Sequence, residues 1–594
     1  MILTSLLTTA TLLATPSPLP QTEQDPQSPA VSLNRTTARF ALAQAPASWD
    51  PIAADVTANQ VIQRQVYEGL FEYKPQAEPV EIQALLAKSW TIQADGLEWI
   101  IHLREDAYFH DPFDPPLWPE RRRQVTAHDV VFSWLRMADG RLPSGGFWAM
   151  QGLFPGLDEF HRETRKSNPK AEEIWQRGLK QGVAGIQVVD KSTLKLRLHR
   201  PDPTLLVKLA SPYFVVYPAE AVERSGDDFL NQPIGSGPYM LESWIPKHQA
   251  ILKQTPAWRG QQHPGSEEIP GGWTMPQIPR LQFTLVAEGS TRVLQFKRGE
   301  IDRLTPLQAA FGELIVNGKP SGELQQRGVS LHRVAPAGIS MIGFNMDDPD
   351  LGWVPGDEEG NQQRRLLRQA IASAYPYGQW HKVIRNNAWA VPARSFLPAG
   401  LPDVPRVPDC KFNHQDFDRA RQLLAQAGWP GGRGAPTLRY ELGGTDAVNA
   451  ATGEMFKQAM AQVGLKVEVV ANTWHDLRAK MNRREAQIFG RGWTMDWADA
   501  ENILSMFYGP NQSPNINRSN FQSEAYDQLY RQMLVAPSQE RETHIRSMLE
   551  LLNEELPSIP VDHRIGFLLL QPWLQGSEVT AFDPFACKFY RLEH

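Results

Sequence analysis

The sequence predicts an α/β fold with a parallel sheet, and the evidence is concentrated between Thr437 and Trp493. In this stretch short strand-like runs alternate with segments of helical spacing, at the distances expected of strand–helix–strand units. The chain has 594 residues, which is too long for one core and enough for two or three domains. Hydrophobic residues make up 41% of the chain and charged residues 21%, which is the balance of a globular protein.

The predicted elements of this stretch follow one another in a fixed order. They are strands at 438–442, 466–470 and 487–489, and helices at 448–463 and 477–484. The first helix ends at Gly464, and glycine commonly closes helices. Because parallel sheets bind ligands at the carboxyl ends of their strands, the loop from Gly490 to Asn502 is the expected ligand loop.

The N-terminal half gives fewer signals. Alternation predicts strands at 38–42, 99–103 and 193–198, and helical spacing predicts a helix at 59–71. Val130, Val131, Trp134 and Leu135 form one helical face after 126–129, which has the composition of a helix start. The segments 110–124, 258–279 and 347–361 are expected to be surface insertions.

Composition and charge exclude several classes of function. The net charge is -6, so no nucleic-acid partner is expected, and the triplet Arg121 to Arg123 is interpreted as a solvated loop. The cysteines, Cys410 and Cys587, form no CxxC motif, and a disulfide between them is left open.

The N-terminus has a feature of exported proteins. Residues Ile2 to Ala14 form an apolar run of the length of a signal-peptide core, although no Lys or Arg precedes Arg35. The alternative is a disordered start. The stretch 16–29, rich in Pro, Gln and Ser, is predicted to be a flexible linker, and no cysteine follows the run to carry a lipid anchor.

No catalytic or metal motif is recognisable. The chain contains no GxSxG, HExxH or P-loop, and Gly235 to Pro238 is predicted to be a tight turn. His102, His110 and His128 lie near acidic residues but on elements that do not converge, so no metal site is predicted. No catalytic residue and no cofactor is expected. Most of the 18 tryptophans are expected in cores, while a few, such as Trp493 and Trp497, are expected to line a cleft.

Ten segments that follow one another along the chain resemble the sequence of a known protein family. They are Ser48–Pro51, Tyr67–Leu70, Leu86–Trp90, Leu103–Asp111, Val125–Ser133, Pro233–Tyr239, Phe344–Asn345, Leu367–Ile371, Gly492–Asp499 and Pro557–Leu574. Together they resemble the solute-binding proteins of ABC importers, family 5, which includes periplasmic oligopeptide-, dipeptide- and nickel-binding proteins. The insertions near Trp118 and Trp273 depart from that pattern.

The resemblance implies a type II periplasmic-binding-protein-like α/β fold, with two lobes, an interlobe cleft and an additional small subdomain. The expected division is a signal-like segment and linker at 1–36, a first lobe from 37–80, 201–335 and 557–594, an inserted subdomain at 81–200, and a second lobe at 336–556. Closure of the hinge would bury the ligand between the lobes.

The resemblance also implies a ligand site. Asp496 is expected to pair with a peptide α-amine and Trp493 to line a neighbouring pocket, with Gly492, Thr494 and Met495 in the same loop. The segment Asp55, Val56 and Thr57 is expected to lie along the peptide backbone. The alternative for Asp496 is a cap on a helix at 498–506.

The function implied is that of a monomeric periplasmic receptor that delivers peptides to an ABC permease and is not an enzyme. A hydrolase, a sensor or chaperone on the same fold, and a non-peptide solute such as a nickel complex, haem or a sugar remain alternatives.

Overall fold

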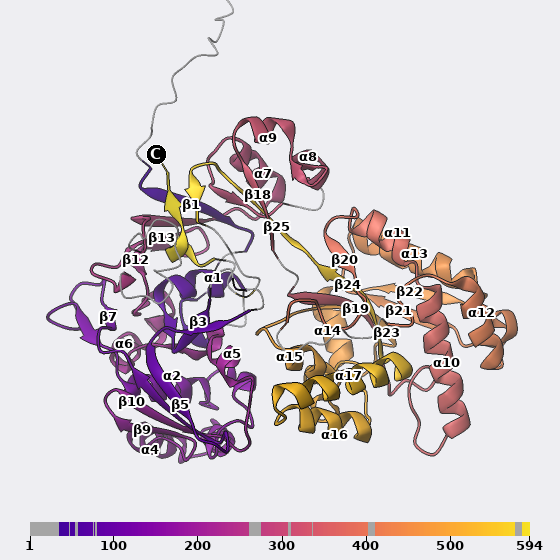
Figure 1. Ribbon diagram of the computed structural model, residues 1–594, viewed down its shortest axis with the longest axis horizontal. Helices are drawn as coiled ribbons and strands as arrows, with labels where there is room; N and C mark the ends of the chain where they lie inside the picture. The colour runs from indigo at the N-terminus through magenta and orange to yellow at the C-terminus, as the bar shows by residue number, and fades with distance from the viewer. Residues whose placement is uncertain are drawn as a thin grey trace, which may run out of the picture.

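The computed structural model describes residues 35–593 except 45, 47, 54–56, 75–76, 78–79, 261–274, 307–309, 335–336, 402–409, 577–581 and 583–584. Two lobes lie side by side, and each contains sheets of its own (Figure 1). The predicted signal run Ile2–Ala14 and its linker lie outside the described residues.

The first lobe contains a seven-stranded sheet made from both ends of the chain. Its order is β12 (Tyr239–Ile245), β13 (Gln249–Gln254), β14 (Arg280–Leu285), β1 (Thr37–Leu42), β15 (Arg303–Leu304), β25 (Gly566–Leu570) and β18 (Ser330–Val334). The strand β1 runs parallel to both neighbours, and β25 runs antiparallel to both of its own. The C-terminal part of the chain therefore completes a sheet that the N-terminal part begins.

A four-stranded antiparallel sheet belongs to the same lobe. Its order is β5 (Ala87–Ile92), β6 (Glu98–Leu103), β10 (Thr193–Arg197) and β9 (Ile186–Asp190), and α2 (Ala127–Met137), α3 (Leu157–Glu163) and α4 (Ala171–Gln181) lie between β6 and β9 in sequence. One continuous hydrophobic core joins this sheet to the seven-stranded one. We call the two together the first lobe.

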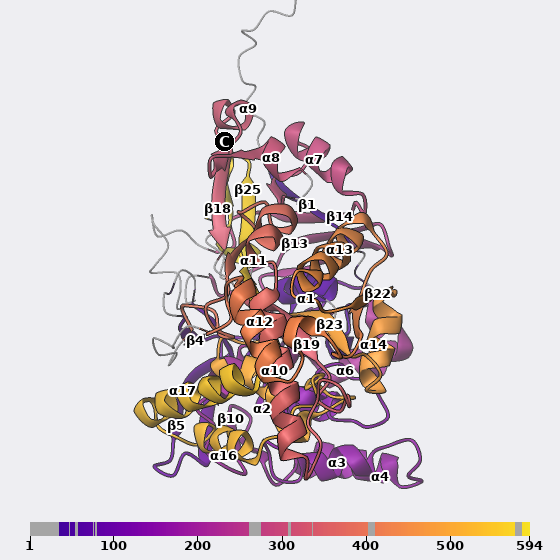
Figure 2. The ribbon, with the colours of Figure 1, turned by 90° about the vertical axis from the view of Figure 1, so that its right-hand side faces the viewer.

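The second lobe is a mixed six-stranded sheet with helices around it. The order is β20 (Ala390–Pro392), β24 (Ser558–Arg564), β19 (Gly338–Phe344), β23 (Ile488–Thr494), β21 (Leu438–Leu442) and β22 (Val467–Ala471). Its main helices are α10 (Glu358–Ala374), α12 (Phe417–Gln426), α13 (Ala447–Ala461), α14 (Trp474–Asn482), α16 (Glu524–Met533) and α17 (Ser538–Glu555). Figure 2 views the molecule from this lobe, with α10 and α12 in front.

Two neighbouring crossings connect the lobes. The chain passes from β18 into β19 and returns from β24 into β25. The strand β18 pairs with β25 in the first lobe, and β19 pairs with β24 in the second, so the two crossings run side by side. Such a pair of connecting strands has the form of a hinge.

The parallel unit predicted in the second lobe is confirmed. The strands β21, β22 and β23 are parallel, with α13 and α14 between them in sequence, and β23 is longer than predicted. The capping prediction at 126–129 is also confirmed, because Thr126 and Asp129 form a reciprocal cap at the start of α2. The segment boundaries implied by the resemblance stay a prediction.

One prediction for the first lobe is wrong. The helix predicted at 59–71 ends earlier, since α1 spans Thr57–Val66, and the chain then enters β2 (Glu68–Gly69) and β3 (Phe71–Tyr73). Tertiary pairing overrides the local periodicity there, because β2 pairs with β11 (Val215–Val216). In the Arg121–Arg123 triplet, Arg121 and Arg122 are exposed, as expected of a solvated segment, whereas Arg123 is half-buried and pairs with Asp129 at 2.6 Å and with Glu220 at 2.9 Å.

Both cysteines are buried, and no disulfide bond joins Cys410 to Cys587. Within the part of the chain that the structure describes, no helix combines the length and the apolar character needed to cross a bilayer.

Candidate functional site

The predicted ligand loop lies at the interface between the lobes. It leaves the end of β23 and enters the short helix α15 (Ala500–Leu504). The backbone N–H of Ala498 donates to the Tyr73 hydroxyl at 3.3 Å, and the Trp497 ring stacks on Trp148 with centroids 5.0 Å apart. Residues 495–501 therefore contact the first lobe along most of their length.

Asp496 is held in this interface by hydrogen bonds with neutral groups. The hydroxyl of Tyr213 donates to Asp496 Oδ1 at 3.0 Å, and the Asp496 backbone N–H donates to Asn502 Oδ1 at 3.3 Å. Burial raises the pKa of the Asp496 carboxyl to about 6, although the bond from Tyr213 acts in the opposite direction. Among the described residues the half-buried Asp496 forms no ion pair, so its charge lacks a cationic partner there.

Asp499, and not Asp496, caps the helix that follows. The Asp499 carboxylate accepts from the backbone N–H of Glu501 at 2.7 Å and pairs with Arg541 of α17. The alternative interpretation of Asp496 as a helix cap is therefore wrong, because α15 begins at Ala500, later than predicted.

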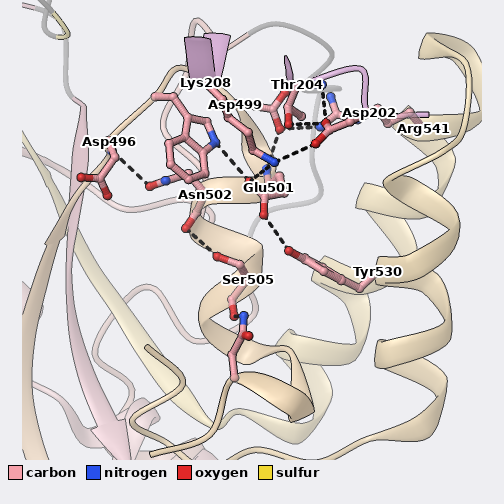
Figure 3. A network of polar contacts seen from close by, with 12 residues as sticks. Asp202, Thr204, Lys208, Asp496, Asp499, Glu501, Asn502, Ser505, Tyr530 and Arg541 are labelled. Carbon is pink, nitrogen blue, oxygen red and sulfur yellow. Dashed lines mark hydrogen bonds and ion pairs between the residues drawn. The ribbon is translucent and has the colours of Figure 1, made fainter. Parts of the chain in front are cut away.

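A buried polar network continues from this cap across the interface (Figure 3). Lys208 of α5 (Leu205–Leu209) lies 3.0 Å from Asp202 in its own lobe and 3.9 Å from Glu501 in the second lobe. Glu501 also accepts from the Tyr530 hydroxyl at 2.7 Å and from the Trp497 indole at 3.1 Å. Burial alone would lower the pKa of Lys208, but Asp202 and Glu501 outweigh it and the pKa is raised.

The other residues predicted for the site are placed as follows. Gly492 and Thr494 are exposed on β23, while Met495 is buried. Trp493 is half-buried and its indole donates to Asn502 Oδ1 at 2.8 Å, which ties it to the same amide as Asp496. Asp55 and Val56 lie outside the described residues. The backbone of Thr57 begins α1.

A guanidinium lies over the same strand. A Cβ at Gly492 would come within 2.7 Å of Arg564 Nη2, so the glycine leaves room for that group. Arg564 Nε donates to Ser340 Oγ at 3.2 Å and, within the described residues, forms no ion pair. The exposed side of β23 and the loop after it thus combine a cation with the carboxylate of Asp496.

A cavity of about 360 Å³ opens beside the loop. Its lining comes from both lobes, and the larger side chains are Trp148, Arg200, Lys208, Trp497, Tyr508 and Tyr530. Ligand pockets combine apolar walls with a few polar groups in this way.

Sequence reasoning missed the first-lobe half of this interface. Tyr73, Trp148, Lys208 and Tyr213 are far from the loop in sequence; Tyr213 and Asp496 are 283 residues apart. The one signal that could have singled out Trp148 is its place beside Gly145 and Gly146, where an aromatic residue in a loop is available for contact.

Comparison with known proteins identifies the family. Residues 81–515 match the family model of bacterial extracellular solute-binding proteins, family 5 Middle. The chain belongs to this family. It is 25% identical over 579 residues to heme-binding protein A of Haemophilus influenzae, covering 94% of this chain and 92% of that protein. It is 24% identical over 511 residues to a dipeptide-binding protein of Pseudomonas aeruginosa, covering 84% of each.

Solved structures of this family share the fold. HbpA2 from Haemophilus parasuis superposes with a TM-score of 0.71 at 22% identity, covering 94% of this chain and 100% of that one. The periplasmic binding protein DppA from Helicobacter pylori, in complex with the peptide STSA, gives a TM-score of 0.69 at 20% identity, covering 94% and 98%. The resemblance stated from the sequence and the two-lobe type II fold are therefore confirmed.

Proposed function

We propose that this solute-binding protein is the extracytoplasmic receptor of an ABC importer and captures peptides that carry a free α-amine. The ligand binds between the lobes, hinge closure buries it, and the closed form is delivered to the permease. The protein acts as a monomer and carries out no chemistry on the ligand.

Asp496 is the observation that carries the proposal. Its half-buried carboxylate accepts from the neutral Tyr213 hydroxyl and forms no ion pair among the described residues, and a charge taken out of water is stable only with a partner. A cationic ligand amine supplies that partner. Arg564, beside Gly492, supplies the opposite charge, which suits a ligand that also carries a carboxylate.

The relatives support this ligand class without deciding it. One relative is named a dipeptide-binding protein and one solved structure holds a peptide, but another relative is named a heme-binding protein. Haem is therefore the rival ligand. It has no amine for Asp496 to bind.

Calorimetric titration of wild type and Asp496→Asn with free and N-acetylated peptide tests the proposal. Leaving a charge buried and unpaired costs about 3–5 kcal/mol, so Asp496→Asn should weaken binding of the free peptide by about two to three orders of magnitude. Acetylation should weaken wild-type binding similarly, and the two losses should not add, because both remove the same pair.

Asp446→Asn is the matched control. Asp446 caps α13 on the surface of the second lobe, and Asn caps equally well, so its affinity should stay at the wild-type value. If Asp496→Asn binds free peptide as tightly as wild type, the amine assignment is wrong. Tight binding of haem by both proteins would favour the rival ligand, and peptide turnover beyond one equivalent would favour a hydrolase.

A further inference from the structure

Three arginines gather on the α14 side of the six-stranded sheet. Arg491 lies on β23, Arg478 on α14, and Arg518 in the segment between α15 and α16. The side chain of Arg491 points to the same face of β23 as Phe489, which packs against α14. Arg478 and Asn482 are one turn apart on α14, and Arg518 Nη1 donates to the Asn482 amide oxygen.

Arg491 is the buried end of this cluster. Arg491 is 8% exposed, and one of its terminal nitrogens, Nη2, donates to the backbone oxygen of Ile516 at 3.2 Å. The other terminal nitrogen, Nη1, is buried and has no hydrogen-bond partner. A buried donor without a partner is unusual in a folded protein and needs a physical account.

The charge of the cluster is also uncompensated. In the described part of the chain none of the three guanidinium groups forms an ion pair, and two acids of neighbouring segments pair with other arginines: Asp347 with Arg484 at 2.8 Å and Glu485 with Arg483 at 2.8 Å. Burial lowers the pKa of Arg491 to about 9, and the positive charge of Arg518 adds to the effect. Arg518 is affected in the same direction, by burial and by Arg478.

Exposure increases from one end of the cluster to the other. Arg491 is buried, Arg518 is half-buried and Arg478 is exposed. The three guanidinium groups thus form a series from the exposed surface of α14 to the buried Arg491.

We propose that this cluster is a binding site for a small tetrahedral oxyanion, phosphate or sulfate. Planar guanidinium groups present paired N–H donors that match the oxygens of such ions, and an oxyanion would supply both the acceptor that Arg491 Nη1 lacks and the negative charge that the cluster lacks. The site does not depend on the peptide-binding proposal. It lies on a different side of β23 from Gly492 and Arg564.

Thermal unfolding in buffers of equal ionic strength tests the site. Chloride is replaced by millimolar phosphate or sulfate, and the midpoint of wild type is expected to rise saturably by about 2 °C or more, because binding to the folded state alone stabilises it. Arg491→Met and Arg518→Met should lose the rise. In chloride, Arg491→Met should melt above wild type, because it removes a buried charge that has no counter-ion, and phosphate should reverse that order.

Two further variants keep the test decisive. Arg483→Met removes an exposed arginine that is paired with Glu485, so it should keep the full response and reports any general effect of the salt. Asp496→Asn should also keep the response, which separates this site from the peptide site. If Arg491→Met does not fold, Arg478→Gln at the exposed rim should weaken the response. An equal rise in wild type, Arg491→Met and Arg518→Met would overturn the proposal, and so would no rise in wild type.

Discussion

Asp496 and Asp499 lie in the same loop and are held in opposite ways. Asp499 pairs with Arg541 and caps α15, so its charge is compensated within the protein. The carboxylate of Asp496 accepts from the neutral Tyr213 hydroxyl and forms no ion pair among the described residues, and burial raises its pKa. Among the described residues only Asp499 of this pair has a cationic partner, and this difference underlies the role proposed for Asp496.

Peptide binding is expected to depend on the protonation of Asp496. The pKa of this carboxyl is about 6, while a peptide α-amine stays protonated throughout the acidic range. Below about pH 6 the free protein holds a proton on Asp496 that the ligand amine must displace, so affinity at about pH 5 should be about tenfold weaker than at neutral pH. Calorimetric titration across this range measures the effect.

The peptide affinity of Asp496→Asn should not change over the same pH range, because the asparagine side chain does not titrate there. Acid unfolding caused by the Asp496 carboxyl does not explain the expected loss of peptide affinity. The raised pKa means that the folded ligand-free protein binds the proton more tightly than the unfolded chain, so this group favours folding as the pH falls from about 6 toward about 4. A wild-type affinity that does not change between neutral pH and about pH 5 would contradict the role of Asp496.

At the scale of the element, α15 is a short helix that depends on its cap and its packing. It spans five residues from Ala500 to Leu504, all of which are buried. A helix this short has little stability of its own. Its position therefore rests on Asp499, which joins it to α17 through Arg541.

Asp499→Ala is expected to destabilise the protein strongly. It removes the cap and breaks a buried ion pair, and breaking such a pair costs about 3–5 kcal/mol. Asp446→Ala is the control, because Asp446 caps α13 at an exposed position and its loss should cost about 1 kcal/mol. Urea unfolding of both variants measures the difference, and equal losses would show that the Arg541 pair contributes nothing.

At the scale of the whole molecule, the chain crossings and the interface at the ligand loop both connect the lobes. The side-by-side crossings from β18 to β19 and from β24 to β25 form the hinge. The interface at the ligand loop adds the stacked Trp148 and Trp497 rings and the Lys208–Glu501 pair. This interface thus joins groups that are far apart in sequence.

Glu501→Gln is expected to shift the protein toward a more open form. It removes the second-lobe partner of Lys208, while Asp202 at 3.0 Å keeps the lysine paired in the first lobe. The closed form loses a contact that the open form does not have, so its population should fall. Small-angle scattering of the ligand-free protein should show a larger radius of gyration than wild type.

Glu441→Gln is the control for this variant. Glu441 pairs with Lys480 at 2.9 Å within the second lobe, so its loss should lower stability and leave the radius of gyration unchanged. If both variants scatter like wild type, the Lys208–Glu501 pair does not contribute to closure.

The sequence by itself determined the features that depend on neighbours along the chain. The parallel unit of β21, β22 and β23, the cap at Thr126 and the loop that carries Asp496 were all predictable, because periodicity and capping are local. The resemblance of ten successive segments to the family added the prediction of a two-lobe fold.

Only the tertiary structure decided what that loop meets. The contacts of Asp496 with Tyr213, of Trp497 with Trp148 and of Glu501 with Lys208 join parts of the chain that no local pattern relates. The same applies to the end of α1 at Val66, which pairing of β2 with β11 imposes, and to the uncompensated charge of Arg491. Burial and pairing arise when distant segments pack together, and they set whether a carboxylate or a guanidinium keeps a partner of its own or is left to bind one from outside.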